Sequence, residues 1–559
     1  MWSTAQVKLV GHVLDASTGA GVANAHVVLS GENAVAVTAN TGATGAFELA
    51  LEPGKQYTVS EAAAEDYEPY SREWSSSAIT IATGSDARTQ DVTLYLKPMV
   101  EYTGVVQDMH EARVAGASIR LVDLRPTEHA VDSLADELTS DGRGEFKFYA
   151  PENALLEAWH RAHGSGRARI DATVAFTRRL VIRLDQAADA TLSTAGITGR
   201  VVAANGTPIP SAAVRAVHVE TYEMHPRAQV LAGADGQFEI EGLDAGMHVV
   251  WVVCEGCAST RSRVMTGTDV TLTVGRGSEL AGRVVDANNG APVQMFSVQL
   301  LRRRGTHHVV LEEVTVVHPD GRFELRGVPD GDFFVRAAAR GHAISDLVSV
   351  SVAETDFKRA EVLVRLERGA AIEGVVLDRS SNAPIERALV AVEGSSEFRS
   401  AALAIGVSTI TDSAGRFAIT GVSPGLRSVR AGTAGYHMAM VSGLEANAGT
   451  TIGPLEIKLT KTGMNEQPQV DLSGIGARLE SDEGVLVVAD IVKHGGASIA
   501  GLRVGDVIVK VDGELVTALG VRAAIERTRG PPGSSVLLTL RGPDETLKDI
   551  RVLRRPFRY

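Results

Sequence analysis

The sequence predicts an all-β chain in which one β-sandwich unit is repeated five times and is followed by a smaller C-terminal domain. The first observation is a strand-like opening that begins with glycine in each copy. The second is a Gly-x-Phe triplet at a later point in every copy. The third is a composition of 57 glycines and only 5% aromatic residues, which suits short strands joined by tight turns. The opening glycines are Gly11, Gly104, Gly199, Gly282 and Gly374.

Within each copy, the order of turns and alternating segments predicts six or seven short strands. The glycine of the triplet allows a positive φ or a close backbone approach, and the phenylalanine two residues later is expected to point into the core. Each copy ends in another alternating strand. The phenylalanines are Phe47, Phe146, Phe238, Phe323 and Phe417.

The second copy contains a conflict between local propensity and the repeat. Residues 153–163 favour a helix by composition. In the register of the repeat, however, residues 156–159 align with residues 335–338 of the fourth copy. We therefore predict a strand there.

Composition excludes several classes of protein. The net charge of -13 argues against nucleic-acid binding, which needs Lys and Arg to replace counterions. No apolar run approaches the roughly 20 residues that span a bilayer. Residues 1–6 lack the basic and apolar regions of a signal peptide, so either the protein stays inside or its export signal lies outside this sequence.

Three motifs have residue types that occur in chemical sites. Residues 421–425 fit G-x-S-x-G, but the repeat predicts a turn between strands there and not a nucleophile elbow. Cys254 and Cys257 form a C-x-x-C that we interpret as a thiol pair or a local disulfide, with a metal site as the alternative. His160 and His163 would face opposite ways on a strand, which favours a solvated pair. We expect no enzyme activity, no catalytic residue, no cofactor and no metal.

The C-terminal stretch 473–479 has the pattern of a binding loop. A glycine-flanked apolar turn before a strand can direct backbone N–H groups toward one point, where they bind a carboxylate. Apolar segments follow at residues 484–492, 507–513, 536–540 and 547–555, and a helix is expected at residues 521–529.

The landmarks of the repeats resemble the carboxypeptidase regulatory-like family, an Ig/transthyretin-like sandwich related to Cna B-type repeats of bacterial surface proteins. The last 90 residues or so resemble a PDZ domain. The chain lacks the His-x-x-Glu zinc motif of metallocarboxypeptidases, so the family name of the repeats implies no activity. The expected domains are five sandwiches and a PDZ domain, at residues 1–98, 99–192, 193–276, 277–368, 369–463 and 464–559.

The PDZ resemblance implies a groove that takes an extended peptide or a protein C-terminus by strand addition, with a carboxylate at the N–H groups of residues 475–477. Val521 at the helix start is not the His of Ser/Thr-preferring PDZ domains, so apolar side chains are the expected guests. No Arg or Lys lies shortly before Gly474, which favours internal segments over free C-termini. The expected peptide-binding residues are Gly474, Ile475, Gly476, Ala477, Arg478, Leu479, Val521, Ala524 and Ile525.

The expected function is a non-enzymatic scaffold of the bacterial cell envelope whose PDZ domain captures peptides. One alternative is a structural or adhesive rod whose repeats bind carbohydrate or protein, for instance through Trp74. A second alternative is an adaptor for a protease or secretion system. In a third alternative, the PDZ domain binds no peptide and only docks on the last sandwich. The repeat family implies an extracytoplasmic location, although a cytoplasmic one stays open. Short linkers, including residues 460–469, predict an elongated monomer.

Overall fold

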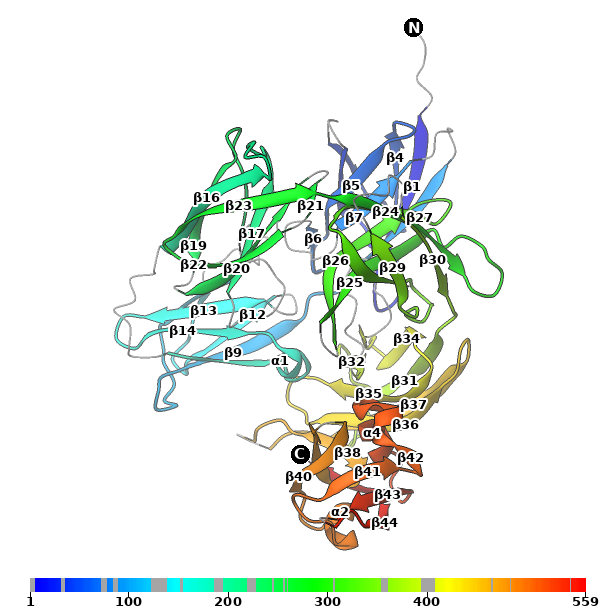
Figure 1. Ribbon diagram of the computed structural model, residues 1–559. Helices are drawn as coiled ribbons and strands as arrows, with labels where there is room; N and C mark the ends of the chain where they lie inside the picture. Colours follow the sequence, from blue (N-terminus) through cyan, green and yellow to red (C-terminus); the bar gives the residue numbers. More distant parts are fainter. Residues whose placement is uncertain are drawn as a thin grey trace.

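The computed structural model shows an all-β chain with little helix outside the C-terminal domain, which confirms the predicted fold class (Figure 1). Among the described residues, no helix is long and apolar enough to cross a membrane. Trp74 and the predicted domain boundary at residue 192 lie outside the residues that the structure describes. The structure describes residues 6–558 except 32–35, 72–77, 84–88, 122–137, 151–153, 185–194, 219–227, 244–245, 255–256, 259, 305–306, 353–359, 394–407, 464–465, 483 and 543.

Five sheets, one in each copy, share one arrangement of three strands, and in the third copy the short strand β21 (Cys257–Ala258) adds a fourth. In each, the strand that carries the opening glycine is central, with the Gly-x-Phe strand antiparallel on one side and the last strand of the copy parallel on the other. The central strands are β1 (Val7–Asp15), β9 (Glu101–Gln107), β16 (Ala195–Ala203), β24 (Ser278–Asp286) and β31 (Ala370–Asp378). Their antiparallel partners are β4 (Ala46–Leu51), β12 (Glu145–Tyr149), β19 (Gln237–Leu243), β27 (Arg322–Val328) and β34 (Arg416–Val422). Their parallel partners are β8 (Gln90–Leu96), β15 (Arg179–Arg183), β23 (Asp269–Arg276), β30 (Ala360–Leu366) and β37 (Thr451–Leu459).

A second sheet covers each of these five sheets. Its members pair in the order β3-β2-β5-β7, β11-β10-β13-β14, β18-β17-β20-β22, β29-β28-β25-β26 and β33-β32-β35-β36. In the second copy, β13 (Leu155–His160) is a strand, as the repeat register predicted against local helix propensity. The other bounds are β2 (His26–Gly31), β3 (Val37–Asn40), β5 (Gln56–Ala63), β7 (Ala78–Ala82), β10 (Ser118–Leu121), β11 (Leu138–Thr139), β14 (Gly164–Arg169), β17 (Ala213–His218), β18 (Ala228–Leu231), β20 (Met247–Val253), β22 (Thr260–Met265), β25 (Met295–Arg304), β26 (His307–Val317), β28 (Gly331–Ala338), β29 (Val348–Val352), β32 (Leu389–Val392), β33 (Ser408–Ile410), β35 (Gly425–Gly432) and β36 (Met438–Ala446).

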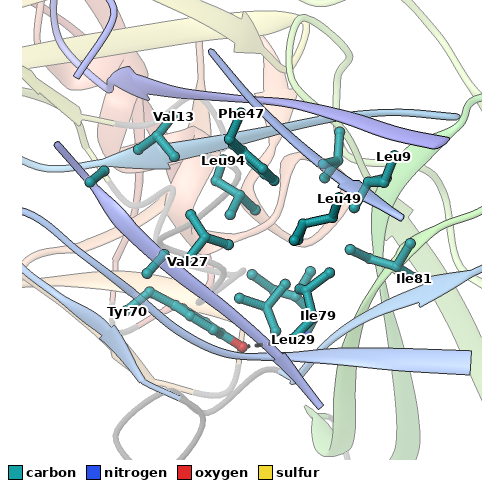
Figure 2. Close-up of a cluster of buried hydrophobic side chains, with 14 of the residues drawn as sticks. Leu9, Val13, Val27, Leu29, Phe47, Leu49, Tyr70, Ile79, Ile81 and Leu94 are labelled. Atoms are coloured by element: carbon teal, nitrogen blue, oxygen red, sulfur yellow. Dashed lines mark hydrogen bonds between the residues drawn. The ribbon is translucent and has the colours of Figure 1, made fainter. Parts of the chain in front are cut away.

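The hydrophobic cores lie between the paired sheets. Figure 2 shows the core of the first copy, where Phe47 and Leu49 of β4 meet Val27 and Leu29 of β2. The five triplet phenylalanines are each at most 6% exposed, and the glycine two residues before each has a φ between 67° and 77°. Both expectations for the triplet are therefore confirmed.

The sandwiches do not form an extended rod. Strand β7 of the first copy pairs in parallel with β26 of the fourth, so the two copies share one continuous sheet (Figure 1). Val317 of β26 is 1% exposed and belongs to the core of the first copy. The second copy packs on the fifth, where Leu389 and Met438 complete its core. The expected elongated shape is therefore wrong, because contacts between distant copies fold the chain back on itself.

The C-terminal domain is built on the sheet β39-β40-β41-β43-β44, with the short strand β42 beside β41. Its helices are α2 (Gly496–Ala500), α3 (Val516–Leu519) and α4 (Val521–Thr528). Residues 460–469 are not a free spacer, because Lys461 bridges to Tyr436 and the Gln469 carbonyl accepts from Met438 N–H. The strands are β38 (Val470–Gly474), β39 (Ala477–Asp482), β40 (Val485–Ile491), β41 (Val507–Val511), β42 (Glu514–Leu515), β43 (Ser535–Arg541), β44 (Leu547–Leu553) and β45 (Arg555–Arg558).

Three short elements complete the sandwiches. Helix α1 (Ala172–Thr177) lies in the second copy, and its N-cap Asp171 accepts from Val174 N–H. Strand β6 (Tyr70–Ser71) pairs with β5, and β21 (Cys257–Ala258) pairs with β23.

Candidate functional site

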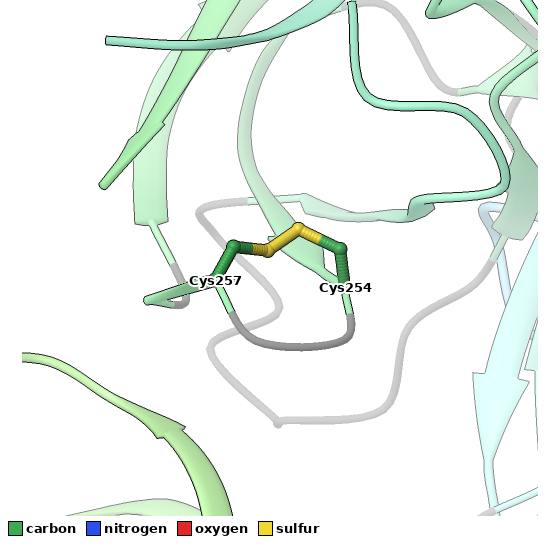
Figure 3. Close-up of a disulfide and its surroundings, with 2 residues drawn as sticks. All are labelled: Cys254 and Cys257. Atoms are coloured by element: carbon green, nitrogen blue, oxygen red, sulfur yellow. A yellow bond between two sulfur atoms is a disulfide. The ribbon is translucent and has the colours of Figure 1, made fainter. Parts of the chain in front are cut away.

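The motifs outside the C-terminal domain do not form a catalytic site. Residues 421–425 join β34 to β35, so a strand and not a helix follows the turn, which excludes a nucleophile elbow. Cys254 and Cys257 are joined in a disulfide (Figure 3), one of the two states that we expected. Within the part of the chain that the structure describes, no three His, Cys, Asp or Glu side chains are grouped to hold a metal.

The expected arrangement of His160 and His163 is wrong. Strand β13 ends at His160, and His163 lies in the turn that follows, so the strict alternation of a strand does not apply. The two rings are neighbours, with centroids 5.0 Å apart. His163 Nδ1 also lies 3.8 Å from Asp108 Oδ2.

The candidate peptide site lies between β39 and α4. Strand β39 is at the edge of its sheet and, among described strands, pairs only with β40. Ala477 and Leu479 of β39 are half-buried against the domain core, as are Val521 and Ile525 of α4. The edge of a sheet presents unpaired backbone groups to which an extended chain can add.

The loop that leads into β39 has a left-handed backbone conformation at one of its glycines, Gly476, which glycine adopts without strain. Gly476 has a φ of +72°, and a Cβ at this position would lie 3.1 Å from Gly495 Cα. Gly474 instead bridges to Arg529, just after α4. A side chain at residue 476 is thus disfavoured both by the positive φ and by the neighbouring backbone.

Only part of the predicted carboxylate nest is free to bind. The N–H of Ile475 donates to the Thr528 carbonyl at 3.2 Å, and the Ile475 side chain is 2% exposed in the core. Val492 N–H donates to the Gly476 carbonyl at 2.9 Å, and Ala477 is opposite Ile491. Because antiparallel pairs alternate, this register turns the N–H of Ala477 away from β40 and toward the open edge. The sequence could not reveal that the end of α4 takes up the Ile475 donor.

Two of the predicted peptide-binding residues, Ala524 and Arg478, do not point into the groove. Ala524 is fully buried in the domain core, so its side chain does not line an open groove. Arg478 is exposed and forms an ion pair with Glu480 on the outer side of β39. One cation near Gly474 that sequence reasoning missed is Arg529, whose guanidinium pairs with Glu526 at 2.8 Å.

Charged groups tie the C-terminal domain to the fifth sandwich. The fully buried His437 of the fifth sandwich lies 3.3 Å from Glu466 and 3.1 Å from Arg558 Nη1. Arg558 Nε in turn donates to Asp471 Oδ1 at 2.6 Å. Burial raises the pKa of Asp471, but its bonds to Arg558 and Thr460 outweigh burial and lower that pKa overall. Asp471 therefore stays ionised at neutral pH and holds the last strand, β45, against β38.

Comparison with known proteins identifies both kinds of domain. The carboxypeptidase regulatory-like domain family matches residues 8–95, 196–280 and 371–460. The PDZ domain family matches residues 487–542. The chain thus contains three carboxypeptidase regulatory-like repeats followed by a C-terminal PDZ domain. The second and fourth copies, which that family does not match, have the same arrangement of central, antiparallel and parallel strands as the matched ones.

Curated relatives match only the PDZ segment. A probable CtpA-like serine protease of Staphylococcus haemolyticus is 33% identical over 91 residues, which is 16% of this chain and 18% of the protease. The carboxy-terminal processing protease CtpA of Bacillus subtilis is 33% identical over 76 residues, 14% of this chain and 16% of that protein. The chain therefore spans about a fifth of the length of these relatives.

Two solved structures are also similar. The PDZ domain of the carboxy-terminal protease from Vibrio cholerae, solved in complex with peptide, is 28% identical and covers 16% of this chain and 99% of its own, with a TM-score of 0.15. A streptococcal ancillary pilin is 13% identical and covers 48% of this chain and 99% of its own, with a TM-score of 0.16. Both kinds of assigned domain, regulatory-like and PDZ, are non-catalytic, which supports a binding or scaffold role.

Proposed function

We propose that this protein is a non-enzymatic scaffold whose PDZ domain captures an extended peptide by strand addition at β39. The observation that carries the proposal is the open edge of β39, whose Leu479 packs against the same domain core as the half-buried Val521 and Ile525 of α4. A bound peptide would pair its backbone with β39 and place alternate apolar side chains against Leu479, Val521 and Ile525.

The test is peptide binding by the whole chain. A displayed library of random decapeptides is selected on the wild-type protein, and the selected peptide is measured by fluorescence anisotropy. Ile525→Arg should abolish binding, because it places a charge among the apolar groove residues. Ala524 is not used for this test, because it is buried in the domain core. Gly476→Val should weaken binding through backbone strain at the loop.

Leu515→Arg is the matched control, because Leu515 is 49% exposed on β42 and does not line the groove. Circular dichroism checks that each variant is folded. If Ile525→Arg binds the peptide as tightly as the control does, the peptide site is not the groove between β39 and α4.

A second candidate is an adaptor that presents peptides to a protease. The observation that favours it is that the curated relatives of the PDZ segment are carboxy-terminal processing proteases. Co-purification of the whole chain with a protease from the source cells, lost in Ile525→Arg, would support this candidate over an independent scaffold.

We also propose an extracytoplasmic location and a monomeric state. The disulfide between Cys254 and Cys257 supports the first, since disulfides persist in oxidising compartments. Size-exclusion chromatography with light scattering tests the second: a mass near 58.9 kDa is expected, and a multiple of that mass would contradict it.

A further inference from the structure

Both walls of the proposed groove are attached to the fifth sandwich. On one side, β38 runs parallel to β36, with Met438 opposite Val470, and leads through the loop into β39. On the other side, α4 packs against β35 and β36. Both walls of the groove therefore contact the same sheet of the fifth sandwich.

The outer face of α4 makes polar contacts with that sheet. Ser428 of β35 is 1% exposed, and its hydroxyl bonds to the carboxylate of Glu526. The same carboxyl group pairs with Arg529 at 2.8 Å. One turn earlier on the helix, Arg522 donates to the Glu393 carbonyl at 3.0 Å.

The segment after α4 is held by close packing. Gly443 of β36 has a φ of +83°, and a Cβ there would lie 3.0 Å from Pro531 Cδ. Gly530 N–H donates to the Ser473 carbonyl at 3.3 Å, which ties this segment back to β38. The C-terminal end of α4 therefore cannot move independently of the fifth sandwich.

We infer that Ser428, Glu526 and Arg522 are positioning residues that fix the width of the peptide groove. The inference rests on the proposed function, because it concerns the same groove. A peptide side chain that is too large for the space between β39 and α4 would have to push the helix outward. Such a movement would leave the buried Ser428 hydroxyl without its partner and would remove one of the two partners of the Glu526 carboxylate, which is unfavourable. The attached helix therefore selects small branched apolar side chains over large aromatic ones.

The experiment compares two peptides on the whole chain. Both are based on the peptide selected by the wild-type protein, with either valine or phenylalanine at the position that contacts Ile525. The wild type should prefer the valine peptide. Ser428→Ala should weaken valine-peptide binding about three- to ten-fold and raise the phenylalanine-to-valine affinity ratio by a similar factor, because the released helix can move.

Glu514→Gln is the matched control. It breaks the 2.9 Å ion pair between Glu514 and Arg527, which joins α4 to β42 inside the PDZ domain and not to the fifth sandwich. The affinity ratio of this control should stay at the wild-type value. Arg522→Ala removes a different contact with the sandwich and provides a second variant if Ser428→Ala does not fold.

The outcomes separate the two proposals. If the wild-type protein selects no peptide, the proposed function fails, and this inference fails with it. If the wild type binds peptides but Ser428→Ala and Arg522→Ala leave the affinity ratio unchanged, the groove functions without the sandwich and only this inference is overturned. A general loss of stability would lower both affinities equally and would not change their ratio.

Discussion

The ring of Phe47 lies directly over Gly11, its partner across the β1–β4 pair, and occupies the space that a Cβ on Gly11 would need. The same register joins the opening glycine and the triplet phenylalanine in all five sandwiches. The pairs are Gly11 and Phe47, Gly104 and Phe146, Gly199 and Phe238, Gly282 and Phe323, and Gly374 and Phe417. The two sequence landmarks are therefore one structural unit.

Gly11→Ala should destabilise the first sandwich by about 1–3 kcal/mol, because the added methyl group displaces the ring of Phe47. The double variant Gly11→Ala/Phe47→Leu should lose less than the sum of the two single changes, since the smaller side chain leaves room for the methyl group. Urea unfolding followed by circular dichroism measures both. Gly42→Ala is the control, because the nearest atom to a Cβ there is 3.9 Å away. Additive losses in the double variant would contradict the steric explanation.

Phe323→Ala should destabilise the fourth sandwich by about 3–5 kcal/mol, the range for truncating a buried phenylalanine. Because β26 of this sandwich pairs with β7, hydrogen exchange should also become faster in β7 of the first sandwich. Peptide binding should persist, since the groove is attached to the fifth sandwich. Protection factors that change only within residues 278–366 would mean that the shared sheet does not couple the two copies.

A peptide with a free C-terminal carboxylate should bind at most about ten-fold more tightly than its C-terminal amide. A full set of charge-assisted bonds to a carboxylate would exceed this ratio, but the Ile475 donor is already bonded to Thr528. Anisotropy titrations of the two peptides measure the ratio. Equal affinities would mean capture of internal segments, and a ratio far above ten would mean that Thr528 releases the Ile475 N–H on binding.

Tyr67 and Tyr436 should ionise at a higher pH than an ordinary tyrosine. The Tyr436 hydroxyl donates to Asp378 Oδ2 at 2.9 Å, and the Tyr67 hydroxyl donates to Asp15 Oδ2 at 3.0 Å. Burial first, and then the neighbouring carboxylate, raise the pKa of Tyr436 to about 12, and the pKa of Tyr67 is raised to about 12 in the same way. These bonds stabilise the fold below the ordinary tyrosine pKa of about 10, and that contribution is lost as the pH rises through about 12.

Phenolate absorbance during an alkaline titration tests this expectation. Asp378→Asn should lower the pKa of Tyr436 and leave that of Tyr67 unchanged, whereas Asp15→Asn should do the opposite. Tyr436→Phe identifies which late transition belongs to Tyr436. If Asp378→Asn leaves the titration curve unchanged, burial alone raises the pKa of Tyr436.

The two cysteines should resist alkylation until they are reduced, because they are bonded to each other. Mass spectrometry of the protein isolated from its source under acid quenching should show no alkylated cysteine before reduction and two after it. Alkylation of both residues without reduction would mean a free thiol pair in the cell and would remove the support for an oxidising compartment.

Sequence alone determined the architecture of the single units. Alternation within strands assigns each side chain to a face, and the recurring glycines and phenylalanines mark the same turns and core positions in every copy, so the sandwiches, the strand β13 and the PDZ domain could be predicted. Only the tertiary structure decided how the units meet. The pairing of β7 with β26, the bond from Ile475 to Thr528, the burial of Ala524 and the contact between Ser428 and Glu526 join residues that are far apart in the chain. No periodic pattern encodes such contacts, because each depends on one or a few side chains or backbone groups whose partners are set by the packing of whole domains.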